Sequence, residues 1–295
     1  MTGREQGFLL LTSQLGNPDR KILTPAQLRE LAKRVRTLQV REPNRDLEES
    51  DLLGLGYGRE MAQRIVALLS EEELLAHYCR QGEKSGCLPL SRVTPGYPQA
   101  VWQRLELESP GCLWTKGDLR ILEKNAVALV GSRELSRENE LFAKAVGYQA
   151  ARQGFVLVSG NARGADRTAQ EACLEAGGCV ISVVADSLQG RRERERVLYI
   201  SEDGFDQPFS AQRAISRNRV IHSMGQMTFV AQCGYQTGGT WDGTVKNLRF
   251  GWSPVYCYGD GSPAMELLSR MGAMEVDITQ LENFDALPRP VAGLF

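Results

Sequence analysis

The sequence has few of the residues that build metal and catalytic sites. Its 295 residues include two histidines, His77 and His222, and seven cysteines that form no Cys-x-x-Cys pair. Zinc sites need clusters of these residue types at short spacings, so we expect no metal and no cofactor. Because the cysteines are odd in number and several lie in apolar runs, they indicate reduced core residues of a cytoplasmic protein.

Long hydrophobic runs and a strong net charge are also missing. No apolar stretch approaches the roughly 18 residues that a membrane helix needs, and Met1 to Phe8 lacks the apolar region of a signal peptide. We therefore expect no membrane contact. With 35 basic and 36 acidic residues, the formal net charge is −1, so any nucleic-acid binding must come from a local basic patch.

The chain is organised around residues 126–176, where strand, glycine loop and helix follow one another twice. Ala126 to Val130 and Phe155 to Val158 are short apolar runs that stop at glycine loops, which is typical of strands buried on both faces. Between them, apolar residues at helical spacing follow a cap at Ser136 or Asn139. Two such units predict adjacent parallel strands with right-handed crossovers.

Further apolar runs extend this α/β pattern. They predict strands at 179–184, 227–231 and 255–258 and helices at 244–250 and 264–271. The expected fold is a Rossmann-like parallel sheet flanked by helices, with a small N-terminal all-helical domain. We place the helical domain at 1–92, the Rossmann-like domain at 93–278 and a short tail at 279–295.

Anion-binding chemistry is expected in the loops that follow the strands. In an open parallel sheet, ligands bind beyond the carboxyl ends of the strands, where helix N-termini also point. Three loops there combine glycine with hydroxyl residues, and the first two add arginine, which suits close approach of a phosphate. They are Gly131-Ser132-Arg133, the segment 159–164 (SGNARG) and Thr237-Gly238-Gly239-Thr240. The alternative is that they are plain strand-to-helix turns.

These motifs, in this order and spacing, resemble the DNA-processing protein A family (DprA, also called Smf). Gly131-Ser132-Arg133 matches its Gly-Ser/Thr-Arg, segment 159–164 its Ser-Gly-x-Ala-x-Gly, and Arg217-Asn218-Arg219 its Arg-Asn-Arg, within a similarity from about Tyr97 to Tyr258. The resemblance implies a Rossmann-like domain of the SLOG superfamily that binds single-stranded DNA and forms a homodimer. It also implies a role in DNA recombination during natural transformation, with RecA as the partner that receives the DNA.

The sequence departs from the family pattern in several places, and two of them bear on function. Trp241-Asp242-Gly243 replaces the usual residues after the third turn. We also expect no carboxy-terminal winged helix, which is frequent in the family. The first departure leaves an alternative open, in which the crevice binds a mononucleotide as a sensor or as a LOG-like phosphoribohydrolase. The LOG glutamate is absent, with only Asp242 following the turn, and the sequence has no P-loop lysine pattern or serine triad signature. We therefore expect a protein that is not an enzyme.

The expected DNA contacts are amides and arginines of the three turns and of the Arg-Asn-Arg segment: Gly131, Ser132, Arg133, Ser159, Gly160, Arg163, Gly164, Arg217, Asn218, Arg219, Gly238, Gly239 and Thr240. Arg217 and Arg219 cannot share a helix face, so one should meet phosphate and the other the protein. Phe205, Phe209 and Trp241 are candidates for stacking on bases. A core position is an equal alternative for Trp241 and for one of the two phenylalanines.

Two other segments carry weaker signals for DNA contact. The mixed-charge run 189–196 (QGRRERER) is expected to be an exposed helix in preference to a DNA patch. Leu52 to Leu69 resembles a helix-hairpin-helix module, in which Gly54-Leu55-Gly56 would offer amides to a DNA phosphate. A purely packing role for this hairpin is equally open.

Overall fold

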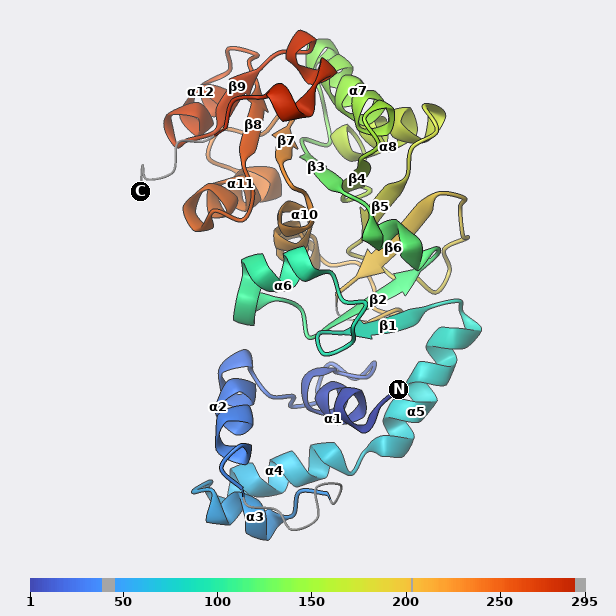
Figure 1. Cartoon of the computed structure of the whole chain (residues 1–295), viewed down its shortest axis with the longest axis vertical. Coiled ribbons are helices and arrows are strands. Elements are labelled where there is room, and N and C mark those ends of the chain that lie inside the picture. The colour runs from blue at the N-terminus through green and yellow to red at the C-terminus, as the bar shows by residue number, and fades with distance from the viewer. Residues whose placement is uncertain (39–45, 203, 290–295) are drawn as a thin grey trace.

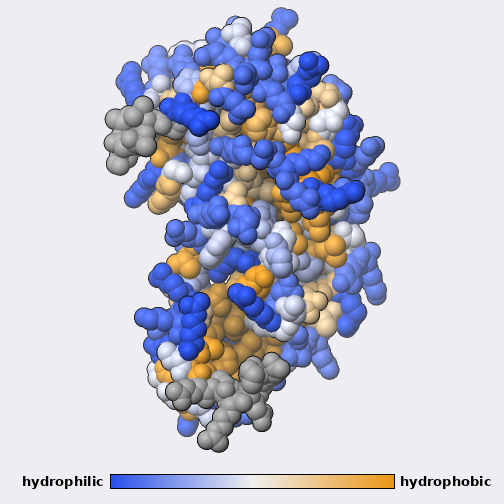
Figure 2. Space-filling view, viewed as in Figure 1, coloured by the Kyte–Doolittle hydropathy of each residue, from blue (hydrophilic) through white to orange (hydrophobic). Residues whose placement is uncertain are grey.

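The computed structural model describes residues 1–38, 46–202 and 204–289, which form two lobes (Figure 1). The helical lobe lies at the bottom of this view and is built from five helices: α1 Gly3–Thr12, α2 Pro25–Val35, α3 Glu49–Gly54, α4 Arg59–Leu69 and α5 Glu72–Lys84. Helix α5 leads up into the sheet lobe. Figure 2 shows hydrophilic residues over most of this face and apolar residues in view on the helical lobe.

The sheet lobe is built on nine strands within the described residues, in the order β1-β2-β6-β5-β4-β3-β7-β8-β9. The seven strands from β6 to β9 run parallel, and β1 and β2 add an antiparallel end. Their bounds are β1 Leu88–Ser91, β2 Cys112–Lys116, β3 Ala126–Val130, β4 Val156–Ser159, β5 Val180–Val183, β6 Val197–Ser201, β7 Thr228–Val230, β8 Val255–Tyr258 and β9 Met274–Val276.

Helices cover both faces of the sheet, as expected for the Rossmann-like class. On one face lie α7 Arg137–Arg152 and α8 Ala165–Glu175; on the other lie α6 Gln99–Leu105, α10 Asn218–Met224, α11 Gly238–Phe250 and α12 Pro263–Arg270. Helix α9 Ala211–Ser216 leads directly into α10. Four 3₁₀ turns complete the described elements: 106–108, 119–123, 279–282 and 284–286.

The structure confirms the predicted fold class and the predicted parallel pairs. Strands β3 and β4 are adjacent and parallel, and Ser136 caps α7 by accepting from the amide of Asn139. Each predicted strand is present to within one or two residues. All seven cysteines lie in the described residues and are unpaired, and six of them are buried.

Three local expectations differ from the structure. Strand β1 lies inside the range assigned to the helical domain, yet it pairs with β2, so the sheet lobe begins at Leu88. Residues 189–196 form a largely exposed loop between β5 and β6 rather than a helix. In the predicted tail, residues 279–289 pack on the sheet lobe through buried Leu281 and Phe284, and residues 290–295 lie outside the described residues.

An aromatic cluster joins the two lobes. The rings of Tyr78 in α5, Trp114 in β2 and Phe205 lie within 5.2 Å of one another, centroid to centroid. The Tyr78 hydroxyl also donates to Asp206 at 2.6 Å. Phe205 is 1% exposed, so its ring is part of the core and unavailable to stack on a base. The core alternative that the sequence left open for one phenylalanine therefore applies to Phe205.

Candidate phosphate-binding crevice

The three glycine turns meet at the carboxyl ends of β3, β4 and β7, where they line two adjoining hollows. The α11 hollow measures about 340 Å³ and is lined by residues of all three turns, including Gly131–Arg133, Ala162 and Gly238–Thr240. The arginine hollow measures about 300 Å³ and is lined by Gly160–Arg163, Arg167, Arg191 and Phe209, among others. Arg133, Ala162, Ala214 and Arg217 line both hollows, which together form the crevice.

The N-terminus of α11 opens into the α11 hollow. The third glycine turn is itself the first turn of this helix, which begins at Gly238 rather than at the predicted Thr244. Thr237, the residue before it, makes no side-chain capping hydrogen bond to the described residues. Since the first amides of a helix have no partner within it, they remain available to an anion, and the helix dipole favours negative charge there.

Two side chains fix the start of α11 against its neighbours. The Thr240 hydroxyl donates to the Gly131 carbonyl at 3.0 Å, and the Asn218 side-chain amide donates to the Gly239 carbonyl at 2.8 Å. Asn218 therefore positions the helix, so its side chain serves the crevice indirectly. The N-terminus of α7 is different because Ser136 satisfies it, although it starts at the same edge of the sheet.

Arg217 lies between the two hollows and is 7% exposed. A Cβ at residue 160 would overlap its guanidinium group, so Gly160 is what allows the arginine to lie against this loop. Its Nε atom is buried and has no hydrogen-bond partner among the described residues. Burial lowers the pKa of Arg217, and the carboxylate of Asp166, 3.9 Å from its Nη2 atom, opposes that shift. A buried donor without an acceptor lowers the free energy of unfolding, that is, it destabilises the folded protein.

Four further arginines surround Arg217 in the crevice. Arg163 pairs with Glu134 at 2.9 Å and Arg191 with Asp186 at 2.5 Å. Arg133 and Arg167 are exposed and have no ion pair within the described ranges. The sequence analysis missed Arg167 and Asp166, and for the run that contains Arg191 it preferred an exposed helix to a DNA patch. Arg167 stands three residues after the segment 159–164, in the first turn of α8. That closeness to the second glycine turn is the sequence signal that could have identified it.

Several groups expected to bind phosphate are engaged within the protein. The Ser132 amide donates to the Gln232 carbonyl at 2.8 Å, and the Ala162 amide donates to Asp166 at 3.1 Å. Ser159 is fully buried, and its hydroxyl accepts from Gln170 at 2.7 Å. Gly164 has φ +84°, and a Cβ there would overlap the carbonyls of Ser132 and Arg133. These residues shape the crevice by bringing two loops together.

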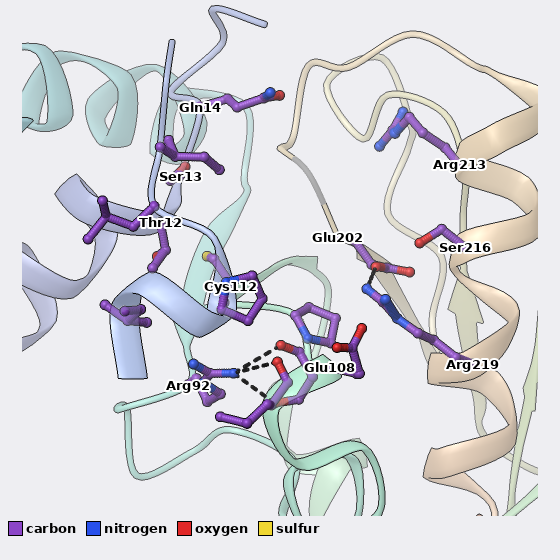
Figure 3. A pocket seen from close by; sticks show the side chains of 18 of the residues that line it. Thr12, Ser13, Gln14, Arg92, Glu108, Cys112, Glu202, Arg213, Ser216 and Arg219 are labelled. Carbon is purple, nitrogen blue, oxygen red and sulfur yellow. Dashed lines mark hydrogen bonds and ion pairs between the residues drawn. The ribbon is translucent and has the colours of Figure 1, made fainter. Parts of the chain in front are cut away.

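Arg219 lies on the opposite side of the α9–α10 segment from Arg217. It faces the interlobe cleft, about 530 Å³, which the end of α1 and the segment after it line from the helical lobe. There its Nη2 donates to Glu202 at 2.5 Å, with Ser216 nearby and Arg213 farther along the same segment (Figure 3). Arg92 closes the floor of this cleft by donating to the Leu107 and Ser109 carbonyls. Of the two outer arginines in the triplet, Arg217 faces the crevice.

The remaining stacking candidates differ in exposure. Phe209 is 57% exposed and lines the arginine hollow, so its ring is accessible to a base. Trp241, on the buried side of α11, is 8% exposed and packs in the core. Its ring is therefore unavailable for stacking, in agreement with the packing alternative.

The described residues contain no cluster of three or more His, Cys, Asp or Glu side chains that could hold a metal ion. In the same residues, none of the helices has both the length and the apolar character needed to cross a membrane.

Comparisons with known proteins place this chain in a family. The chain is 29% identical to Protein Smf from Escherichia coli over 140 residues, which is 44% of this chain and 37% of that protein. It is 31% identical to DNA processing protein DprA from Streptococcus pneumoniae over 149 residues, 46% of this chain and 52% of that protein. The matches thus span about half or less of these relatives' lengths.

Solved structures show the same fold. DNA processing protein A from Streptococcus pneumoniae has a TM-score of 0.70 at 22% identity and covers 95% of this chain and 96% of its own. DNA processing protein A from Helicobacter pylori, solved for its single-stranded DNA binding mode, has a TM-score of 0.57 at 21% identity, with 67% and 94% covered. The sequence profile of the family described as DNA recombination-mediator protein A matches residues 90–245, more than half of the chain. The protein therefore belongs to the DNA recombination-mediator protein A family.

Proposed function

We propose that this protein binds single-stranded DNA in the crevice and does not catalyse a reaction. The observation that carries the proposal is Arg217, which is 7% exposed and lies between the two hollows. Its Nε has no partner among the described residues, and its nearest carboxylate, Asp166, is 3.9 Å away, too far for a hydrogen bond. A phosphate oxygen is the acceptor that such a group favours, since charge-assisted hydrogen bonds to phosphate are the strong ones. The Helicobacter pylori relative, named for single-stranded DNA binding, supports the same ligand.

The geometry suggests where successive parts of a strand would lie. One phosphate would sit in the α11 hollow against the amides of Gly238 to Thr240. The next would sit in the arginine hollow, near Arg163 and Arg167, with Arg133 between the two. The exposed ring of Phe209 would then stack on a base, which tolerates any sequence and contributes about 1–3 kcal/mol per base.

The non-enzymatic part of the proposal rests on the third turn. Asp242, which takes the place nearest to the LOG glutamate, is exposed on α11, and the carboxylate that lines the α11 hollow is Asp166 instead. Asp166 is bound to the Ala162 amide and lies beside Arg217. An acid held in this way is suited to a structural role more than to proton transfer.

The partners follow from the family and are proposals of the same kind. We propose that the protein acts as a homodimer in the cytoplasm and delivers the bound strand to RecA during DNA uptake or recombination. Co-sedimentation with RecA on a single strand, compared for the wild type and a crevice variant, would test the delivery step separately from DNA binding.

The test of DNA binding is a titration of fluorescent oligo-dT at several salt concentrations. For single strands, the logarithm of the affinity should fall with the logarithm of the salt concentration, with a slope near 0.7 per neutralised phosphate. A slope of about 2 would correspond to three neutralised phosphates. Affinity that does not change with salt would contradict the proposal, because it would mean that the arginines of the crevice do not meet a polyanion.

A mononucleotide ligand is the second candidate, because each hollow, at about 340 and 300 Å³, falls at the small end of the usual range for ligand sites. A thermal-shift panel of nucleoside mono- and diphosphates separates the two ligands. Saturation by one nucleotide together with indifference to oligo-dT would favour the second candidate.

A further inference from the structure

Asp166 is a carboxylate buried inside the crevice that we propose to be filled by phosphate. It is 5% exposed and lies in the first turn of α8. Its Oδ2 atom accepts from the Ala162 amide at 3.1 Å and lies 3.9 Å from Nη2 of Arg217. An anion at this place repels a phosphate, and burial leaves the repulsion poorly screened by salt.

The distance between Asp166 and Arg217 is too long for a hydrogen bond. The carboxylate therefore offsets the charge of the guanidinium without occupying its donors, and Arg217 can bind another acceptor without breaking a bond. The other carboxylates near the arginine hollow are different, because Glu134 and Asp186 hydrogen-bond their arginines directly and are 88% and 45% exposed. Among the described residues, Asp166 is thus the buried negative charge of the crevice.

We propose that Asp166 is a built-in counter-anion that keeps the empty crevice ordered and lowers its affinity for phosphate, so that strand binding stays reversible. This inference rests on the proposed function. Asp166 acts as a positioning residue, since it holds the Ala162 amide and neutralises Arg217 in the free protein. When a phosphate takes over the neutralisation of Arg217, Asp166 becomes a cost to binding, and its charge sets the affinity.

Proton uptake by Asp166 gives the proposal a pH dependence with a definite sign. Burial raises the pKa of Asp166, while Arg217 and Arg133 oppose the shift. The charges of Glu202 and Asp186 also act on Arg217, raising its pKa, but less than that of Asp166 does. As the pH falls toward the raised pKa, Asp166 loses its negative charge, so the wild-type protein should bind oligo-dT more tightly. A variant without this carboxylate should lack that part of the pH response.

The test compares Asp166→Asn with Glu202→Gln by titration of fluorescent oligo-dT at fixed salt. Both changes neutralise a buried carboxylate beside an arginine of the same triplet, but Glu202 faces the interlobe cleft. A charge within about 4–6 Å shifts a pKa by 1–3 units, which corresponds to a coupling of tenfold or more. We therefore expect Asp166→Asn to bind about tenfold more tightly at pH 7.5, and Glu202→Gln to bind within about twofold of the wild type.

Thermal unfolding adds a readout that simple loss of packing would not reproduce. Asp166→Asn leaves Arg217 without its counter-charge, so the free variant should melt below the wild type. Oligo-dT should then raise its melting temperature by more than it raises that of the wild type. Equal or weaker oligo-dT binding by a folded Asp166→Asn protein would overturn the proposal.

If Asp166→Asn does not fold, the proposal is tested by the pH dependence of oligo-dT binding in a protein that keeps Asp166. It is measured between pH 7.5 and 5 in a His77→Gln background, so that no exposed histidine of the described residues contributes to the profile. Tighter binding at lower pH supports the proposal, and flat or weaker binding overturns it. A wild type that binds no oligo-dT at any pH would instead defeat the proposed function, so the two failures are distinguishable.

Discussion

The two sides of the α9–α10 segment present the same kind of ion pair to two different spaces. Toward the crevice, Arg217 lies 3.9 Å from Asp166, and its Nε, like that of Arg219, has no hydrogen-bond partner among the described residues. Toward the interlobe cleft, Arg219 donates to Glu202 at 2.5 Å. Both carboxylates are more than nine-tenths buried. The difference is that Arg219 is bound to its carboxylate, whereas Arg217 is only neutralised by its own.

This comparison shows why the sequence alone could not assign the two arginines. They are two residues apart in one motif and have the same chemistry, yet the pairing distance determines their roles. A hydrogen-bonded pair between β6 and α10 stabilises the structure, and breaking it would leave a buried charge. A looser pair leaves the guanidinium donors available to a ligand. We therefore expect changes on the crevice side to alter DNA affinity and changes on the cleft side to alter stability.

The largest effect on DNA affinity is expected from Gly160→Ala. The added Cβ would occupy the space of the Arg217 guanidinium and displace it without removing any charge from the protein. Hydrogen bonds to charged groups contribute about 1.5–3 kcal/mol, so oligo-dT binding should weaken roughly 10- to 100-fold. Gly190→Ala, in an open part of the exposed loop, is the control and should bind as the wild type does. Unchanged binding by Gly160→Ala would mean that Arg217 is not a contact.

The two phenylalanines of the loop before α9 should also differ, with Phe209 affecting DNA affinity and Phe205 affecting stability. Phe209→Ala should weaken oligo-dT binding by about 1–3 kcal/mol with little change in melting temperature, because the ring is 57% exposed. Phe205→Ala should instead cost about 3–5 kcal/mol of unfolding free energy, since its ring packs on Tyr78 and Trp114. Chemical denaturation and titration on both variants check this. Loss of stability without loss of binding in Phe209→Ala would reverse the assignment.

A smaller effect is expected from Arg133→Ala, because Arg133 is exposed and contributes mainly charge. The slope of affinity against salt should become shallower by about 0.7, the value for one phosphate contact on a single strand. Lys144→Ala is the matched control, as Lys144 is an exposed cation on α7 paired with Glu140. An identical slope for wild type and Arg133→Ala would remove Arg133 from the binding surface.

The smallest effect on DNA affinity is expected from His222, which lies on the buried side of α10. Burial lowers its pKa to about 3, from about 6.5 in an unfolded chain. The unfolded state therefore takes up a proton that the native state refuses, and stability is lost as the pH falls from about 6.5 toward 3. The loss attributable to this residue is about 1.4 kcal/mol at pH 5.5.

His222→Gln should reduce the loss of unfolding free energy at low pH and leave oligo-dT binding at pH 7.5 unchanged. Denaturant unfolding at pH 7.5 and 5.5 measures the difference, with His77→Gln as the control at an exposed histidine. The same loss of stability between the two pH values in wild type and His222→Gln would contradict the assignment.

The sequence was sufficient for the parallel sheet because its signals are local. Ala126 to Val130 is apolar throughout and stops at glycine, and β3 occupies the same residues. β1 was missed because Leu88–Ser91 is short, contains a proline and lies among glycines and prolines. It is defined by pairing with β2, a contact with a strand more than 20 residues away in the sequence.

The site was predictable in outline, since the convergence of the three turns follows from parallel topology. Its details depended on tertiary contacts. Phe205 is buried by Tyr78 from the helical lobe, and Trp241 by the packing of α11 on the sheet. The identity of the free arginine was likewise decided by which carboxylate each one meets, Asp166 in α8 or Glu202 after β6.

The most direct test of the account is oligo-dT binding by Arg217→Ala and Arg219→Ala, measured at three salt concentrations beside the wild type. We predict that Arg217→Ala binds at least tenfold more weakly with a shallower salt slope, by about 0.7. Arg219→Ala should keep the wild-type slope and lose melting temperature instead. Equal losses of affinity in the two variants, or a larger loss in Arg219→Ala, would contradict the assignment of the crevice as the DNA site.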